Sequence, residues 1–373
     1  MQNDNEGFNY PIVDSKRCLS CGKCLNVCPV LKKRQKSIPL KVFAAKNKSS
    51  DIRQQSTSGG VFTAIAKSIL NKNGVVYGAL FNSKWEVEHD FCDSLDELAY
   101  FRSSKYVQSN INSSYIKAQK HLCENRWVLF SGTPCQIHGL NLFLGKEYQK
   151  LITIEIVCLG VPSPFVFKKY LSETIRNKNK AILLTDIQNI NFRTKDEKWK
   201  GSKFTIQLST QKYLISEGPL KNIYLKGFGA GLYMRPSCYN CPSKGFRSGS
   251  DITLGDYWGV DEVIPKFNDK KGISLVILNT PIGINIFKDL IITSVETSYR
   301  EAYKNNHAIE KSIKQNPKRN EFFSEIDGDI IPVIRKLTHK PIPQTYIDWV
   351  NSKLFAIIRK LKEIKNNQIT YKE

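Results

Sequence analysis

Apolar and polar positions along the chain predict helices and strands in turn. Some stretches have apolar residues at helical spacing and others are short β-rich apolar runs, giving a loop-helix-strand unit and then strand, helix, strand and helix. The predicted elements are helices at 61–70, 134–144 and 163–175 and strands at 74–81, 127–130 and 151–158. This order indicates an α/β fold with a parallel sheet.

The later sequence adds three features. Residues 182–225 alternate in a strand-like way, residues 228–260 are Gly-rich, and residues 274–278 predict another strand. After about residue 296 the sequence becomes Lys- and Asn-rich and loses strand patterning. We therefore expect four parts: a small Cys-containing unit at 1–40, α/β parts at 41–130 and 131–300, and a basic helical tail at 301–373.

The tail contains one apolar helical face surrounded largely by basic residues. This face consists of Ile347, Val350, Leu354, Ile357, Ile358 and Leu361. A basic amphipathic helix suits an anionic membrane surface, but such helices more commonly pack on their own domain, and we expect the second. The longest apolar stretch, residues 151–161, is too short for a membrane span and contains Glu155, so no transmembrane helix is expected.

The composition is that of a globular protein, with 41% hydrophobic and 24% charged residues among 373. The formal net charge of +22 points to an acidic or polyanionic partner. Only 13 of the 56 basic residues are Arg, which is the residue expected where phosphates and bases are read, so no nucleic acid partner is expected. An acidic electron-transfer protein also fits this charge. The polar N-terminus does not suggest secretion, and we expect a cytoplasmic protein whose cysteines are metal ligands or reactive thiols.

Four of the ten cysteines follow the pattern Cys-x2-Cys-x2-Cys-x3-Cys-Pro. They are Cys18, Cys21, Cys24 and Cys28. Three thiolates at this spacing converge on three corners of a [4Fe-4S] cubane, and Gly22 keeps the backbone close to the sulfides. The alternative is a zinc knuckle, but zinc sites usually have two Cys pairs separated by a longer loop, so the pattern favours a ferredoxin-type cluster.

The fourth Cys of this motif serves the other cluster in a two-cluster ferredoxin, so Cys28 is expected to point away from the other three. The sequence has no second copy of the motif, and residues 6–14 look like the linker between two copies. We therefore hypothesise an incomplete ferredoxin-type module, whose other copy was lost or lies upstream of Met1.

A second group of cysteines is dispersed: Cys135, Cys158, Cys238 and Cys241. Cys135 follows one predicted strand and Cys158 ends the next, so parallel neighbouring strands would bring both to the carboxyl edge of the sheet, where α/β proteins bind ligands. The Cys238-x2-Cys241 pair would close a four-thiolate site over that edge. The spacing alone leaves an iron-sulfur cluster and structural zinc both open.

The remaining cysteine chemistry has less support. Cys135 stands at the start of a predicted helix, three residues before His138, which would suit a reactive thiol but leaves the His without an orienting partner. Cys92 and Cys123 have no such context, and we expect both to be small core residues.

Two loops are candidates for ligand binding. Thr57-Ser58-Gly59-Gly60 precedes a helix, where N–H groups, small residues and the helix dipole favour a phosphate or pyrophosphate, although such residues are also ordinary helix caps. Residues 104–109, Ser-Lys-Tyr-Val-Gln-Ser, offer one cation, one ring and several hydrogen-bonding groups, and are equally ambiguous.

Several segments between about residues 50 and 280 occur in the order of one known family. They are Ser58-Gly59-Gly60, residues 104–109, Ser131-Gly132-Thr133-Pro134-Cys135-Gln136, Cys158-Leu159-Gly160-Val161-Pro162, Cys238-x2-Cys241 and Ser250-Asp251-Ile252-Thr253-Leu254-Gly255-Asp256. The sequence resembles the β-subunits of hydrogenases and formate dehydrogenases that act on the deazaflavin coenzyme F420. It is also similar to plant 7-hydroxymethyl chlorophyll a reductase.

The resemblance implies an α/β (α+β) FAD-binding core with a mixed sheet, and a [4Fe-4S] cluster held by Cys135, Cys158, Cys238 and Cys241. It also favours iron over zinc at that site. The flavin-binding residues that it implies are Ser58, Gly59, Gly60, Lys105, Tyr106, Gln108, Thr133 and Gln136. The N-terminal module would feed electrons to the inner cluster and then to FAD, which takes single electrons and passes on a hydride.

These features together predict an iron-sulfur flavoprotein oxidoreductase with one or two [4Fe-4S] clusters and FAD. Electrons would come from a reduced donor such as ferredoxin and pass to a deazaflavin-type or other small organic acceptor. One alternative is an electron-transfer subunit of a larger redox complex without its own substrate, and another is a zinc-stabilised binding protein. The sequence identifies no catalytic acid or base, because nothing fixes the geometry of His138 or Lys105.

Overall fold

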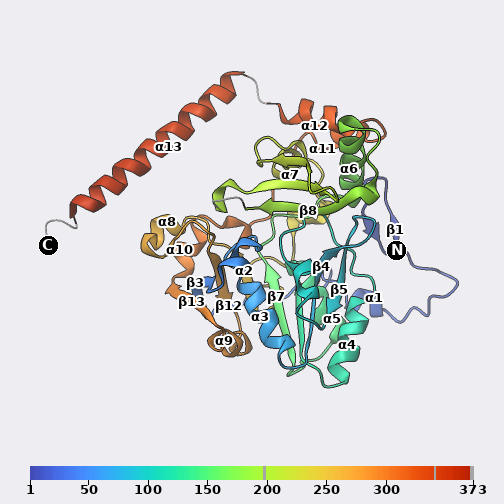
Figure 1. The fold of residues 1–373 in the computed structure, drawn as a ribbon. Helices are drawn as coiled ribbons and strands as arrows, with labels where there is room; N and C mark the ends of the chain where they lie inside the picture. Colours follow the sequence, from blue (N-terminus) through green and yellow to red (C-terminus); the bar gives the residue numbers. More distant parts are fainter. Residues whose placement is uncertain (196–198, 340–341, 370–373) are drawn as a thin grey trace.

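The computed structural model describes residues 1–195, 199–339 and 342–369 and shows a mixed α/β fold (Figure 1). Within these residues the strands form sheets of two, three and eight strands. The largest sheet has the order β13-β3-β12-β11-β7-β6-β4-β5. Its strands are β3 (Lys41–Asn47), β4 (Val75–Phe81), β5 (Val87–Cys92), β6 (Val128–Gly132), β7 (Leu151–Ile156), β11 (Ile252–Asp256), β12 (Ser274–Leu278) and β13 (Ile292–Thr297).

The large sheet is parallel at its centre and antiparallel outside, which confirms the expected mixed sheet. Strands β11, β7, β6 and β4 run parallel to one another. Helices cover both faces, so these strands are apolar along almost their whole length. On one face α3 (Val61–Leu70) packs against Leu129 and Ile152. On the other, α4 (Ser114–Cys123) and α5 (Pro134–Leu144) pack against Phe130.

Most predicted elements lie within a few residues of their expected bounds. The helices at 61–70 and 134–144 and the strand at 274–278 have the predicted ends. The strand predicted over 151–158 ends at Ile156, which leaves Cys158 beyond the sheet. The helix predicted over 163–175 is α6 (Pro164–Lys178), and Ser163 caps it by accepting the Val166 N–H.

A smaller antiparallel sheet lies over the carboxyl edge of the large one. It consists of β8 (Ile187–Thr194), β9 (Lys203–Leu208) and β10 (Tyr213–Glu217), as the alternation at 182–225 predicted. Figure 1 shows it beneath α6, α7 (Ile223–Gly229), α11 (Arg319–Ser324) and α12 (Ile330–Thr338). This layer has a buried aromatic core of Phe167, Tyr170, Phe192, Phe204, Tyr224, Tyr233 and Phe322.

The start of α12 depends on a carboxylate from another helix. The buried Glu173 of α6 accepts the N–H groups of Ile330 and Ile331 at 2.7 and 2.9 Å. Replacing Glu173 by Gln removes the charge that complements these helix N-terminal groups, so the free energy of unfolding should fall by about 2 kcal/mol. Urea unfolding measures this loss. The matched variant Glu325→Gln, at an exposed ion pair with Lys336, should cost about 0.5 kcal/mol or less, and equal losses in the two variants would contradict the capping role.

Residues 1–40 contain only short elements: β1 (Gln2–Asn3), β2 (Asn9–Tyr10) and α1 (Lys23–Asn26). The first residues are tied to the body because Phe8 is fully buried and Glu6 pairs with Arg319. At the other end the Ser37 hydroxyl donates to the Phe246 carbonyl at 2.9 Å. Between these anchors Leu19 and other apolar side chains are exposed. The ferredoxin-type module remains a prediction.

The other helices are α2 (Ser50–Gln54), α8 (Val260–Val263), α9 (Pro281–Lys288), α10 (Tyr299–Tyr303) and α13 (Ile342–Ile369). After β13 the described chain is helical, in agreement with the predicted tail. The expectation that the apolar face of the tail packs on the protein is wrong, because its side chains, from Ile347 to Leu361, are exposed. Within the described ranges, none of the helices has the length and apolar content needed to cross a bilayer.

Candidate functional site

Cys135 and Cys158 lie at the same edge of the large sheet. As predicted, β6 and β7 are parallel neighbours, with Gly132 opposite Glu155. Cys135 follows β6 in the first turn of α5, where Pro occupies the start of the helix. Cys158 lies two residues beyond the end of β7. Both cysteines therefore stand where the carboxyl ends of parallel strands meet.

The Cys238-x2-Cys241 segment folds back onto this edge. The Arg235 N–H donates to the Val161 carbonyl at 3.0 Å, and the Val161 N–H donates to the Cys238 Sγ at 3.5 Å. A Cβ on Gly160 would lie only 3.4 Å from the Cβ of Cys238. The chain that follows Cys158 therefore runs in van der Waals contact with the second Cys segment.

The four dispersed thiols influence one another electrostatically. Burial raises the pKa of Cys135, Cys158 and Cys238, in the last case to about 12, and neighbouring thiols raise each pKa further. Cys241 is one of these neighbours for all three. The structure thus brings the four residues together. A buried thiol with a raised pKa is a poor nucleophile, which argues against a reactive thiol at Cys135.

The donor set fits a [4Fe-4S] cluster. All four cysteines are free thiols, and the Thr133 hydroxyl lies 3.2 Å from the Cys135 Sγ. The buried Lys244 ammonium lowers the pKa of Cys158 and Cys238 and so favours negative charge on their sulfurs. In the part of the chain that the structure describes, no three His, Cys, Asp or Glu side chains are arranged to hold a single metal ion. A cubane instead takes each thiolate on a different iron.

His138 is part of the interior rather than of a nucleophilic pair. Its Nδ1 lies 3.0 Å from the Ser243 hydroxyl, a partner that the sequence did not predict. The residue is fully buried, and burial lowers the pKa of its ring, which keeps the ring neutral.

The remaining cysteines differ in exposure. Cys18, Cys21 and Cys24 are exposed and Cys28 is half-buried, so the structure leaves the first cluster a prediction. Cys92 is buried, as expected. Cys123 is exposed, so its assignment to the core is wrong. The buried face of α4 consists of Ser114, Ala118 and Leu122, at helical spacing, and Cys123 falls outside it.

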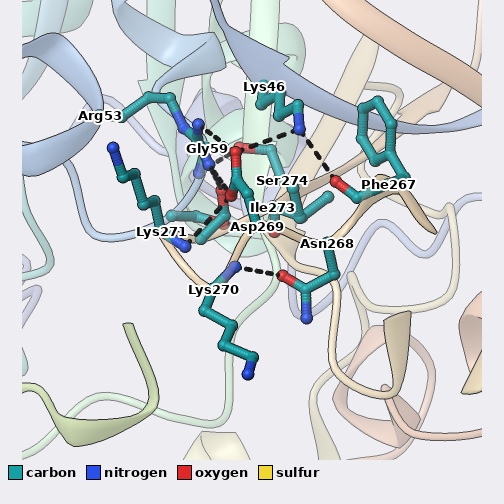
Figure 2. Close-up of polar contacts among 12 residues, drawn as sticks. Lys46, Arg53, Gly59, Phe267, Asn268, Asp269, Lys270, Lys271, Ile273 and Ser274 are labelled. Carbon is teal, nitrogen blue, oxygen red and sulfur yellow. Dashed lines mark hydrogen bonds and ion pairs between the residues drawn. The ribbon is translucent and has the colours of Figure 1, made fainter. Parts of the chain in front are cut away.

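The Ser58-Gly59-Gly60 loop is anchored on the large sheet beside β3 and β12. The Ser58 hydroxyl donates to the Ile273 carbonyl at 2.7 Å. The Gly59 N–H donates to the Ser274 hydroxyl at 2.9 Å, and both residues are labelled in Figure 2. Gly60, with φ of 79°, precedes α3, and no side chain caps that helix. The N-cap residue of α3 therefore offers no side-chain acceptor to the first N–H groups of the helix. Such N–H groups can donate to a bound phosphate.

A charged cluster supports this loop. Arg53 forms a bidentate pair with Asp269 at 2.6 and 2.7 Å, and Lys46 reaches the same carboxylate at 3.1 Å (Figure 2). Burial by itself raises the pKa of Asp269. The hydrogen bonds from Arg53 and Lys46 outweigh burial and hold this pKa well below its ordinary value. Lys195, whose pKa burial lowers to about 7, donates to three carbonyls, including that of Ser58 at 2.7 Å.

Residues 104–109 connect this loop to the thiols. The Ser104 N–H donates to the Thr57 hydroxyl at 2.9 Å. The Gln108 side chain accepts from the Arg235 guanidinium at 3.2 Å. The Gln136 side chain donates to the Ser109 hydroxyl at 2.8 Å. Gln136 also accepts the Thr133 N–H at 2.9 Å. These bonds join residues 104–109 to Thr57 on one side and to Gln136 and Arg235 on the other.

Lys105 and Tyr106 lie at the centre of that run. The Lys105 ammonium donates to the Tyr100 and Arg102 carbonyls, and burial lowers its pKa to about 7. The Tyr106 ring stacks on Phe228, with the centroids 4.7 Å apart. The Lys105 ammonium and the Tyr106 ring therefore already have partners within the protein.

Sequence reasoning missed an ion pair beside these residues. Arg193 of β8 donates to Asp256 of β11 at 3.0 Å and to the Tyr106 hydroxyl at 3.2 Å, and its guanidinium lies over the Trp258 ring. Asp256 stands in a motif and Arg193 in a predicted strand, but no sequence signal links them. Within the described residues, Asp256 Oδ1 and Trp199 Nε1 are buried without a hydrogen-bond partner, which leaves an acceptor and a donor for a bound polar group.

The buried His89 of β5 makes stability depend on pH. Its Nε2 lies 3.0 Å from the Ser131 carbonyl, and burial lowers its pKa to about 4. Between about pH 6.5 and 4 the unfolded chain binds a proton that the folded chain does not, so the free energy of unfolding should fall by about 3 kcal/mol as pH falls.

The variant His89→Gln retains a donor for the Ser131 carbonyl but cannot titrate. Urea unfolding of both proteins between pH 7 and 4 measures the effect, and the stability advantage of the native chain should shrink toward acid. Parallel stability curves for the two proteins would contradict the assignment.

The fold and the site define a mixed α/β protein that gathers four thiols and two polar loops at the carboxyl edge of its parallel strands. Two family profiles match it, both described as "Coenzyme F420 hydrogenase/dehydrogenase, beta subunit". The profile for the N-terminal part of that subunit matches residues 42–116, and the profile for its C-terminal part matches residues 125–300. The chain belongs to the family of coenzyme F420 hydrogenase/dehydrogenase beta subunits, as its motifs indicated.

Two relatives and one solved structure are similar to this chain. The F subunit of the F(420)H(2) dehydrogenase of Methanosarcina mazei is 24% identical over 288 residues, covering 75% of this chain and 71% of the relative. Uncharacterized protein MJ1349 of Methanocaldococcus jannaschii is 24% identical over 319 residues, covering 80% and 78%. A chain of the xenon-derivatised F420-reducing [NiFe] hydrogenase complex from Methanosarcina barkeri is 15% identical, with a TM-score of 0.47 and coverage of 79% and 90%.

Proposed function

We propose that the protein is an electron-transfer subunit of a larger oxidoreductase complex. The observation that carries this proposal is the gathering of four partly buried thiols, from Cys135, Cys158, Cys238 and Cys241, at one sheet edge. The chain also belongs to a family of hydrogenase and dehydrogenase subunits. A subunit is favoured over an independent enzyme because the Methanosarcina mazei relative is itself a subunit of a dehydrogenase.

In this proposal the four thiols hold a [4Fe-4S] cluster, which supplies one-electron transfer when bound. The Val161 N–H and the Thr133 hydroxyl orient two of the sulfurs. Lys244 places a buried positive charge beside the thiolates and offsets their negative charge. The surrounding protein shields the site from water, since Cys135, Cys158, Cys238 and Cys241 are only partly exposed.

The same edge would bind FAD, which couples single-electron transfer to hydride transfer. The uncapped start of α3 and the Ser58–Gly60 loop would receive the negative pyrophosphate. Arg193 and the unpartnered Asp256 Oδ1 would provide polar contacts for other parts of the cofactor. The final acceptor in this proposal is a deazaflavin-type or other small organic molecule.

The N-terminal cysteines would form the entry point for electrons. Cys18, Cys21 and Cys24 are exposed, so a donor such as ferredoxin or another protein of the complex has access to them. The net charge of +22 favours an acidic donor. Electron transfer from such a donor should therefore slow as salt is raised, and rates that are independent of salt would contradict an electrostatic encounter.

The experiment that tests the proposal is strictly anaerobic purification from the native source, followed by iron, zinc and flavin analysis. About four irons and one FAD per chain, with larger subunits that copurify, would support the proposal. About eight irons would add the N-terminal cluster, and cofactors without any partner would favour an independent enzyme. Zinc without iron or flavin would overturn the redox function and leave a zinc-stabilised binding protein.

A further inference from the structure

Helix α13 exposes a large apolar surface that the rest of the protein does not cover. Figure 1 shows the helix standing apart from the sheets and their covering helices. Its exposed apolar side chains are Tyr346, Ile347, Trp349, Val350, Leu354, Phe355, Ile357, Ile358 and Leu361, with exposed fractions of 38% to 73%. A contiguous surface of this kind marks a site of interaction with a partner or a membrane.

The distribution of these side chains suits a lipid surface better than a protein groove. At about 100° per residue, Ile347, Leu354 and Ile358 share one side of the helix. Tyr346 lies about 100° to one side of that stripe and Phe355 about 80° to the other, so the apolar arc covers roughly half of the circumference. Trp349 stands apart from this arc, about 160° from the stripe. A groove contacts only one stripe of a helix, whereas the boundary between headgroups and acyl chains accommodates a wide arc. Trp and Tyr prefer that boundary.

The charge of this segment also favours an anionic surface. In the sequence, residues 342–369 contain five Lys and Arg but only two Asp and Glu, and no acidic residue lies between Asp348 and Glu363. Lys353 and Lys360 border the apolar stripe in the sequence pattern, so pairing with a second copy would bring like charges together. The net charge of +22 adds attraction to anionic lipid.

We propose that α13 lies on the surface of a bilayer that contains anionic lipid, with its apolar arc in the boundary region. The helix does not cross the bilayer, because within the described ranges none of the helices is long and apolar enough. This inference goes beyond the proposed function and depends on neither iron nor flavin, so either can fail without the other.

The test is flotation of the full chain with phosphatidylcholine vesicles and with vesicles that also contain phosphatidylglycerol. The native chain should bind the second kind, bind the first at least tenfold less, and dissociate as salt is raised. The double variant Leu354→Glu and Ile358→Glu places two charges in the centre of the apolar arc and should lower binding at least tenfold. The matched variant Ser352→Glu and Ala356→Glu adds the same charges on the opposite side of the helix and should retain more of the binding.

Three outcomes would overturn the proposal. The native chain does not bind phosphatidylglycerol vesicles, or the two double variants bind them equally, which would assign binding to the general charge of the protein. The third is a native dimer in sedimentation velocity that the Leu354 and Ile358 changes dissociate, without vesicle binding, which would make a second copy the occupant. Circular dichroism confirms that each variant remains folded before its binding is compared.

Discussion

Replacing Cys158 by Ser is expected to remove about four irons per chain and the associated visible absorbance. The four thiols gather at the carboxyl edge of β6 and β7, and a cubane with one thiolate missing loses one of its four anionic protein ligands. The chain should remain folded, since the change only replaces one sulfur atom by oxygen in a half-buried side chain. Iron analysis and the visible spectrum after anaerobic purification measure the loss.

The control for this experiment is Cys123→Ser. Cys123 is exposed on α4, outside the group of four thiols, so its replacement should leave the iron content unchanged. Full iron in the Cys158 variant would show that the dispersed cysteines do not hold the cluster. Complete loss of iron on replacing Cys18 instead would assign all of it to the N-terminal motif.

Replacing Gly59 by Ala is expected to lower the free energy of unfolding by about 3 kcal/mol or more. A Cβ at this position would lie 2.5 Å from the Ala45 carbonyl oxygen and 2.7 Å from the Ser274 nitrogen. These are backbone atoms of two strands in the large sheet, so neither can move without disturbing strand pairing. Urea unfolding followed by circular dichroism measures the loss, and any flavin bound by the native chain should be lost with it.

Gly218→Ala provides the matched control. A Cβ there would meet nothing within 4 Å, and the backbone at Gly218 does not have a positive φ. The stability should therefore change by about 0.5 kcal/mol or less. Equal effects at the two glycines would show that close packing is not what makes glycine necessary at position 59.

Much of the fold is predictable from local patterns. The helix at Pro134–Leu144 has the predicted ends because Pro suits a first helical turn and Gly145 adopts the left-handed conformation that ends it. The parallel order of β6 and β7 follows from the helix between them. The antiparallel positions of β3 and β13 at one side of the sheet depend on long-range pairing, and no local signal specifies them.

The candidate site divides in a similar way. Cysteine spacing and the Ser-Gly-Gly loop were visible in the sequence, since each is a short run of unusual residue types. The pair of Arg193 and Asp256, the buried Lys195 and the cap from Glu173 were not, because each joins residues far apart in the chain. The error at Cys123 has a related cause: helical phase relative to the sheet, rather than residue type, decides burial.

The sequence by itself determined the helices and strands of the sheet core, the cysteine motifs and the family, because local periodicity and short motifs carry that information. Only the tertiary structure decided that the four dispersed thiols and both polar loops share one edge, and that the apolar face of α13 is left uncovered. Which residues meet at the site, and which apolar faces are covered, depend on how distant segments pack together. That packing is a property of the whole fold.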